Sequence, residues 1–178
     1  GMQVPNILLP KKGTDMQRWA VIACDQYTSD KGYWQRLTQQ TAGHISTLNL
    51  VFPEAYLDDA DTEERIAAIN QTMQSYLADG SLEEQPPGFI LVDRKTTAVE
   101  SRKGLIVALD LEQYDYTEGA QSLIRSTEGT ILDRLPPRIK VRRNAPIELP
   151  HIMVLIDDPQ RTVIEPLFEE QLETAYDF

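Results

Sequence analysis

A short basic stretch of the sequence combines residue types that suit phosphate binding. Residues 125–148, RSTEGTILDRLPPRIKVRRNAPIE, contain five arginines and one lysine in a chain whose net charge is −11. Arginine suits phosphate because its planar guanidinium offers two parallel donors and a permanent charge. Arg134, Arg138 and Arg142 are spaced by four residues, so on one helical face they would repel each other unless an anion neutralised them. The stretch therefore predicts a site for a small anion.

Two other side chains of this stretch extend the site towards catalysis. Transfer of a phosphoryl group to a hydroxyl needs a carboxylate within hydrogen-bond reach, and Glu128 could serve as that general base. Thr130 could donate a hydrogen bond to the same phosphate. We therefore predict Glu128 as the catalytic residue and the following side chains as phosphate ligands: Arg125, Thr130, Arg134, Arg138 and Arg142.

The same stretch also has a purely structural interpretation. Surface arginines commonly pair with carboxylates of their own chain, and such ion-pair networks resemble binding sites in a sequence. The basic strip could equally dock onto another part of the protein or onto a partner. Both interpretations stay open at this point.

Other chemistries find little support. His44 and His151 have no partner at metal-ligand spacing, so no metal site is predicted. Cys24 precedes Asp25, whereas a reactive thiolate needs a positive neighbour. The sequence contains no Walker loop, GxGxxG or GxSxG motif.

Composition predicts a single folded domain. The chain has 178 residues, 41% of them hydrophobic and 25% charged, as in ordinary globular proteins. No apolar run approaches the roughly 20 residues of a membrane-spanning helix, so no membrane partner is expected. One cysteine cannot form an internal disulfide, which fits a cytoplasmic location. The acidic net charge disfavours nucleic-acid binding, although residues 120–145 carry six basic side chains against two acidic ones.

Hydrophobic periodicity predicts an α/β fold, or a mixed α+β one, with a layered mixed sheet of about five or six strands and helices packed on it. Helices are predicted after a cap at Asp30, from Asp61 to Gly80, over 137–143 beyond a proline pair, and after Asp158. Strands are predicted at 19–23, 46–52, 88–94, 103–111, 119–126 and 151–157.

Longer phrases of the sequence resemble a known family. WAVIACDQYTSD, LNLVFPEAYL, GLIVALDLEQYDY and IRSTEGTILDRLPPRIKVRRNAPIELPHIMVLIDDP resemble the bacterial and archaeal family of unknown function numbered 1015, sometimes labelled ParB-like or Spo0J-like. The resemblance covers nearly the whole chain. It implies that these 178 residues are the amino-terminal portion of a longer protein.

The resemblance also bears on the site. The family's arginine pattern ends on an asparagine, which here is Asn144 and which the resemblance adds to the binding residues. The ParB-like label implies kinship with folds that bind a nucleotide through arginines. Some of these phosphorylate a small hydroxyl compound such as free serine.

We therefore expect a domain that binds a phosphate-bearing small molecule, with a nucleotide as the first candidate. Its enzymatic version is a kinase-like phosphotransfer to a small hydroxyl compound, assisted by a divalent cation. The alternative is a non-catalytic interaction domain, whose basic strip docks on the carboxy-terminal half of the protein or on a partner protein.

Overall fold

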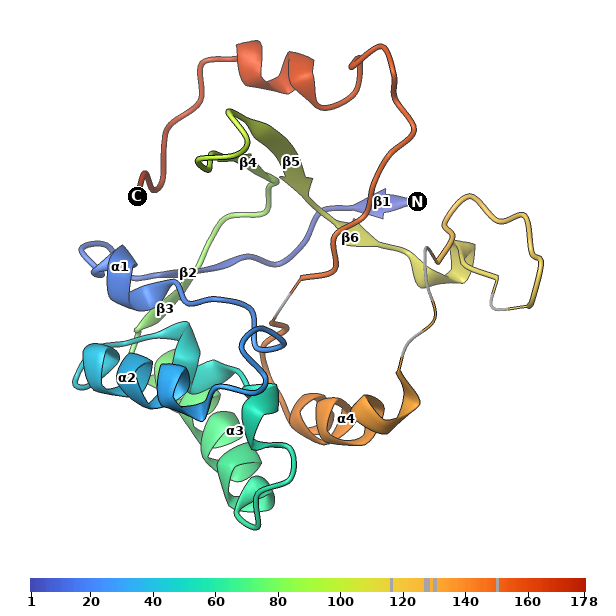
Figure 1. The fold of residues 1–178 in the computed structure, drawn as a ribbon. Coiled ribbons are helices and arrows are strands. Elements are labelled where there is room, and N and C mark those ends of the chain that lie inside the picture. Colours follow the sequence, from blue (N-terminus) through green and yellow to red (C-terminus); the bar gives the residue numbers. More distant parts are fainter. Residues whose placement is uncertain (116, 127–128, 130, 150) are drawn as a thin grey trace. The chain divides into compact units, whose positions relative to one another are not determined.

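The computed structural model describes residues 1–115, 117–126, 129, 131–149 and 151–178. Its backbone forms two compact units. Unit 1 comprises the described residues of 1–8, 84–129 and 154–177, and unit 2 those of 9–83, 130–153 and 178. Four α-helices belong to unit 2: α1 (Met16–Trp19), α2 (Lys31–Thr41), α3 (Thr62–Ala78) and α4 (Leu135–Arg143) (Figure 1).

The strands of the described chain pair two by two. They are β1 (Met2–Gln3), β2 (Leu8–Pro10), β3 (Leu82–Glu84), β4 (Ile90–Arg94), β5 (Arg102–Ile106) and β6 (Ala108–Leu109). The pairs β1–β6 and β4–β5 are antiparallel, and β2 pairs with β3. With 34% helix and 13% strand among its described residues, the chain has the predicted α/β class. The predicted sheet of five or six strands is wrong, because no sheet of the described residues exceeds two strands.

Helices α2 and α3 form where the sequence predicts them. Asp30 caps α2, its carboxylate accepting a hydrogen bond from the Tyr33 amide at 2.9 Å. The buried side chains of α3 recur three and four residues apart: Ile66, Ile69, Met73 and Tyr76. Gly80 follows α3 with a φ of 73°, which glycine adopts without steric cost. Among the described residues, no helix combines the length and the hydropathy that a bilayer crossing requires.

Two predicted strands near the amino terminus are wrong in type. Residues 20–23 follow α1 without regular secondary structure. Residues 46–52 contain the 3₁₀ helix η1 (Thr47–Leu50), which begins where the Ser46 hydroxyl accepts a hydrogen bond from the Leu48 amide. A serine side chain that binds the backbone in this way favours a turn over a strand. Leu50 is nevertheless buried, so the alternating pattern located the core correctly.

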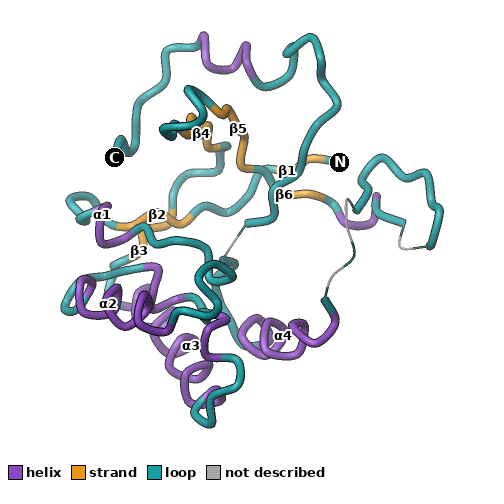
Figure 2. Tube along the Cα trace, in the orientation of Figure 1, coloured by secondary structure: helices purple, strands orange, loops and turns teal. Residues whose placement is uncertain are grey.

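The carboxy-terminal third also departs from the prediction. Residues 151–157 have no regular structure, and Ile152 is 81% exposed. Of 119–126, only Ile124 forms a bridge, to Tyr114. The predicted last helix is replaced by the five-residue 3₁₀ helix η5 (Glu165–Glu169). The Asp158 carboxylate accepts a hydrogen bond from the Val163 amide and closes a turn instead of starting a helix. Loops accordingly make up most of the chain after α4 (Figure 2).

Helix α4 follows the 3₁₀ helix η4 (Leu132–Arg134) directly. Pro136 and Pro137 lie in its first turn, where a missing amide hydrogen breaks no helical hydrogen bond. The predicted short helix at the proline pair is thus confirmed, with its start two residues earlier. Figure 1 shows α4 beside α3, which it contacts. This placement brings the arginines of α4 close to the segment that leads into α3.

The hydrophobic core lies in unit 2. Trp34, Leu50 and Met73 are at most 1% exposed. The Tyr76 hydroxyl accepts hydrogen bonds from the Ser46 amide at 3.1 Å and from the Asn49 side chain at 3.2 Å, which ties η1 to α3. Among the described residues, unit 1 contributes only Ile7 to the buried hydrophobic side chains.

Candidate functional site

Two of the predicted arginines meet at one buried carboxylate. Glu54 is only 6% exposed. Its Oε2 accepts a hydrogen bond from Nη1 of Arg134 at 2.6 Å. Its Oε1 accepts two more from Arg138, from Nε at 3.1 Å and from Nη2. The carboxylate raises the pKa of Arg138 through its hydrogen bonds to that side chain, so the Arg138 guanidinium stays charged beside Glu54.

Local structure fixes each member of this cluster. Glu54 opens the 3₁₀ helix η2 (Glu54–Tyr56) directly after Pro53. Its amide donates a hydrogen bond to the carbonyl of Cys24 at 2.8 Å, so the loop before α2 supports it from behind. Arg134 ends η4, and Arg138 lies one turn further on in α4. The spacing of four residues therefore places two guanidinium groups on one carboxylate of the chain itself. This contact is the ion pairing of the structural interpretation and does not test whether the arginines bind an external anion.

Beside this cluster lies a cleft of about 590 Å³, within unit 2. A cleft of this size can hold a small-molecule ligand. Its polar lining consists of Thr28, Glu54, Asp58, Thr62, Asp133, Arg134 and Lys140. Unit 1 has a cleft of similar size, about 560 Å³, but none of the predicted site residues lines it.

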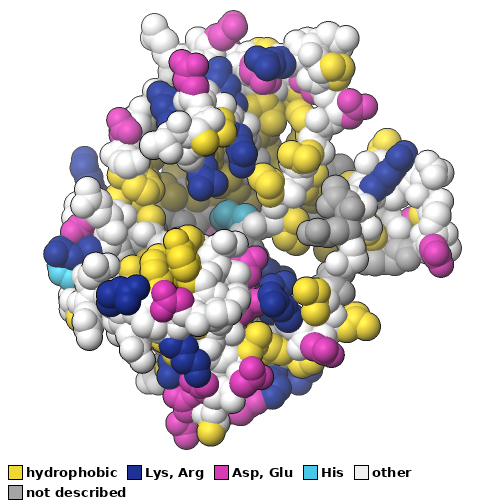
Figure 3. Space-filling view, viewed as in Figure 1, with side chains coloured by type: hydrophobic (Ala, Val, Ile, Leu, Met, Phe, Trp, Pro, Cys, Tyr) yellow, Lys and Arg dark blue, Asp and Glu magenta, His cyan; other side chains and the backbone are white. Residues whose placement is uncertain are grey.

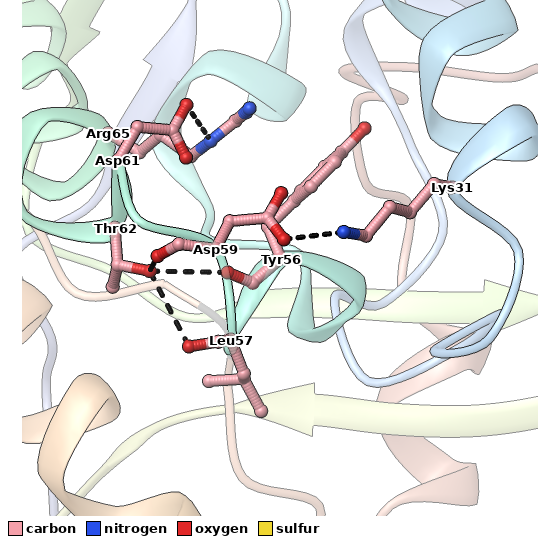
Figure 4. Close-up of polar contacts among 7 residues, drawn as sticks. All are labelled: Lys31, Tyr56, Leu57, Asp59, Asp61, Thr62 and Arg65. Atoms are coloured by element: carbon pink, nitrogen blue, oxygen red, sulfur yellow. Dashed lines mark hydrogen bonds and ion pairs between the residues drawn. The ribbon is translucent and has the colours of Figure 1, made fainter.

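The turn between η2 and α3 forms one wall of the cleft. Figure 4 shows the Thr62 hydroxyl directed at the backbone carbonyls of Tyr56, Leu57 and Asp59, and it donates most closely to Asp59, at 2.7 Å. Lys31 pairs with the Asp59 carboxylate in the same view. These contacts link the turn to its own backbone and to α2.

The other predicted residues that the structure describes do not join the cluster. Arg142 pairs with Glu148 at 2.6 Å, and both side chains are exposed. Asn144 is the C-cap of α4 and is exposed. Arg125 belongs to unit 1, where its Nε donates to the Ser122 carbonyl at 3.0 Å. The predicted base Glu128 and the predicted donor Thr130 lie outside the described residues.

Sequence reasoning missed Glu54 and Lys140. Glu54 stands alone in the apolar phrase LVFPEAYL, and a charged residue in such surroundings is buried only when it has a partner. That signal could have identified it as the counter-charge of the arginines. Lys140 pairs with Glu63, an exposed contact, while also lining the cleft. On the face drawn in Figure 3, basic side chains are interspersed with acidic ones.

Comparison with known proteins gives a family and no nearer relative. The model of a family described as "Protein of unknown function (DUF1015)" matches residues 8–178. The chain belongs to the DUF1015 family. No curated protein and no solved structure matches the sequence. The resemblance read from the sequence phrases is thereby confirmed for the family, and the match spans both units of this DUF1015 chain.

The DUF1015 chain offers no metal centre of its own in the part that the structure describes. No group of three or more His, Cys, Asp or Glu side chains is placed to hold an ion there. The cleft does contain two carboxylates besides Glu54, those of Asp58 and Asp133. Magnesium is commonly held by one or two carboxylates together with the phosphate oxygens of a ligand.

Cys24 lies next to the cluster but is a poor nucleophile. Burial raises the pKa of its thiol, and the charges of Asp25 and Glu54 raise it further. The positive charge of Arg138 lowers it again, by less. A reactive cysteine needs a lowered pKa, because the thiolate is the attacking species. Cys24 therefore serves the site through its backbone carbonyl, which holds Glu54.

This electrostatic setting predicts slow alkylation of Cys24. At about pH 8, near the ordinary cysteine pKa, iodoacetamide should modify the folded chain several-fold more slowly than the urea-unfolded chain. The rate should keep rising with pH above the ordinary value, because the raised pKa delays thiolate formation. Arg138→Gln removes the one charge that lowers this pKa and should slow the reaction further at a given pH. Mass spectrometry follows the modification, and equal rates in folded and unfolded chains would contradict the prediction.

Proposed function

We propose that the chain binds a phosphate-bearing small molecule, with a nucleotide as its ligand, in the cleft of unit 2. The observation that carries the proposal is the position of Arg134, which lines the cleft while the buried Glu54 holds its guanidinium. A guanidinium has five N–H donors, so one hydrogen bond to Glu54 leaves donors for a second oxyanion. A side chain already fixed by such a contact loses little entropy on binding a ligand.

The charges around the cleft support a phosphate that arrives with a cation. Glu54 and its two arginines together carry one net positive charge, and the cleft lining also includes Asp58, Asp133 and Lys140, which pairs with Glu63. A bare phosphate would meet both signs of charge. A magnesium–phosphate complex satisfies both, because the carboxylates bind the ion and the cationic side chains bind phosphate oxygens.

The enzymatic version of the proposal is a kinase-like transfer to a small hydroxyl compound. In this version the two predicted residues outside the described part of the chain keep their roles: Glu128 would accept the hydroxyl proton, and Thr130 would donate a hydrogen bond to the phosphate. The ParB-like kinship implied by the family resemblance belongs to this version of the proposal. So does a cytoplasmic location, which the lack of a second cysteine supports.

The binding proposal predicts a specific loss in Arg134→Gln. Ribose 5-phosphate and AMP should bind in the presence of magnesium, and the variant should bind both about tenfold more weakly, as the loss of one charged hydrogen bond implies. Lys140→Gln should weaken both ligands in the same direction. Calorimetric titration measures the affinities. Arg138 still pairs with Glu54 in the Arg134 variant, so the fold should persist.

Arg36→Gln is the matched control, because Arg36 is an exposed arginine of α2 that pairs with Asp30 at 3.8 Å. It removes the same charge from the same unit and should leave binding unchanged. The proposal is wrong if no phosphate compound binds the unsubstituted chain, with or without magnesium. It is also wrong if Arg36→Gln weakens binding as much as Arg134→Gln does.

A second candidate is the non-catalytic interaction domain. One observation favours it: residues 152–156 form five consecutive exposed apolar side chains shortly after the basic strip. Exposed apolar surface of this kind often marks a protein contact. The two functions differ in one clear respect, since an interaction domain should show no response to any phosphate compound.

A further inference from the structure

A ladder of aromatic rings runs from the core of unit 2 to its surface. Trp34 is fully buried, at 0% exposure. The Tyr33 ring meets it edge to face, with centroids 5.4 Å apart. Tyr27 then stacks on Tyr33, with centroids 4.2 Å apart and an interplanar angle of 16°. Tyr27 is 53% exposed, so the outermost ring of the ladder is stacked on Tyr33 and reaches the solvent.

The backbone of Tyr27 is held in a conformation that large residues seldom adopt. Its φ is 49°, in the left-handed region. The Tyr27 carbonyl accepts hydrogen bonds from the Trp34 indole at 3.3 Å and from the Asp30 amide at 3.0 Å. Unfavourable backbone conformations persist when surrounding contacts impose them, and they cluster at ligand sites. Here the contacts fix where the exposed ring stands.

Tyr27 adjoins the cleft in the sequence, although its own side chain is not among those that line the cleft. Thr28, the next residue, lines the cleft together with Arg134 and Lys140. All of these residues belong to unit 2. An exposed aromatic ring beside cationic side chains is the combination that binds nucleotides, because every base presents a π face and every nucleotide carries a phosphate.

We propose that Tyr27 is the base-stacking residue of the site and that the ligand is a nucleoside 5′-phosphate, with purines preferred for their larger ring. The inference rests on the proposed phosphate-binding function. It adds recognition of the base, because contacts to the phosphate do not distinguish a nucleotide from a sugar phosphate. Stacking on Tyr27 places the base against the Tyr27–Tyr33 pair. The phosphate of the same ligand would then extend into the cleft, towards Arg134 and Lys140.

The test compares AMP with ribose 5-phosphate, which carries the same phosphate and sugar without a base. Calorimetric titration of the 178-residue chain in magnesium should show AMP binding about tenfold more tightly, the increment expected of one stacked base. Tyr27→Gly removes the ring, and glycine accepts the positive φ without strain. This variant should lose the AMP advantage and keep its affinity for ribose 5-phosphate.

Two further variants separate stacking from other effects. Tyr27→Phe keeps the ring and should keep the preference for AMP. Phe89→Ala removes a comparably exposed ring, 51% exposed, in unit 1 and should change neither affinity. The comparison of the two ligands on the unsubstituted chain needs no variant, so a folding defect in Tyr27→Gly does not remove the test.

The outcomes distinguish the two proposals. Equal binding of AMP and ribose 5-phosphate overturns the stacking role and leaves the phosphate site standing. Binding of neither compound overturns the phosphate site, and the stacking role falls with it. A preference for AMP that survives in Tyr27→Gly also overturns the inference, since another surface must then bind the base.

Discussion

A chain in which Arg134 and Arg138 are both replaced by glutamine is expected to unfold with a free energy about 3–5 kcal/mol lower, because it leaves a buried charge without a partner. Both guanidinium groups bind the Glu54 carboxylate, whose side chain is 4% exposed. Glutamine can still donate a hydrogen bond but carries no charge. Urea titration followed by tryptophan fluorescence measures the change.

Removing the carboxylate should cost less than removing its partners. Glu54→Gln leaves two guanidinium groups that are 38% and 45% exposed, so water can solvate them. We therefore expect a loss of about 1–2 kcal/mol, close to the value of a few net hydrogen bonds. The triple variant, which lacks all three charges, should be more stable than the double arginine variant. If the double variant is no less stable than Glu54→Gln, the carboxylate does not depend on these arginines.

Lys140→Gln provides the matched control for this series. Its partner Glu63 is 69% exposed, and surface pairs of this kind contribute about 0–1 kcal/mol. The variant should therefore unfold almost like the unsubstituted chain. A large loss of stability in this variant would show that burial of the carboxylate does not decide how much each ion pair of α4 contributes.

Trp34→Ala is expected to lower the free energy of unfolding by about 3–5 kcal/mol, as large-to-small substitutions of buried aromatic residues do. Trp34 is fully buried and packs edge to face against Tyr33. Its indole also donates a hydrogen bond to the Tyr27 carbonyl, so the variant leaves that acceptor without one of its donors. The expected loss includes both the cavity and this missing contact.

Trp19→Ala is the matched comparison, because Trp19 is only half-buried and lies near Tyr76 with centroids 6.5 Å apart. It should lose less stability than Trp34→Ala. The chain has two tryptophans, both in unit 2, so the remaining one reports unfolding of that unit in each variant. Equal losses in the two variants would mean that burial at Trp34 is not the dominant factor.

The sequence predicts burial in this protein better than it predicts secondary structure. The helical periods of α3 and the alternation of Leu48, Leu50 and Phe52 both mark side chains that are buried. Alternation alone, however, does not separate a strand from a 3₁₀ turn, and the Ser46 hydroxyl decides for the turn. Short apolar runs such as 151–157 form strands only when a neighbouring strand supplies hydrogen bonds, which a local pattern does not encode.

Two cations of the candidate site, Arg134 and Arg138, were predictable from the sequence, whereas Lys140 and the carboxylate that pairs with the arginines were not. The spacing of four between Arg134 and Arg138 indicates that they can act on one anion. Glu54 lies 80 residues before Arg134, and no local pattern joins positions so distant. The aromatic ladder was not predictable for a similar reason. Tyr27 stacks on Tyr33 because its backbone is left-handed, and a tyrosine in the sequence does not indicate that conformation.

Because the buried side chains are concentrated in unit 2, we expect unit 1 to open before unit 2 when the chain unfolds locally. Amides of the β4–β5 hairpin, whose strands contain no buried side chain, can exchange with solvent through openings that leave Trp34 and Met73 packed. Each unit is therefore expected to unfold cooperatively by itself. A ligand bound in the cleft would then slow amide exchange in unit 2 further. The exchange rate of the β4–β5 hairpin would stay unchanged.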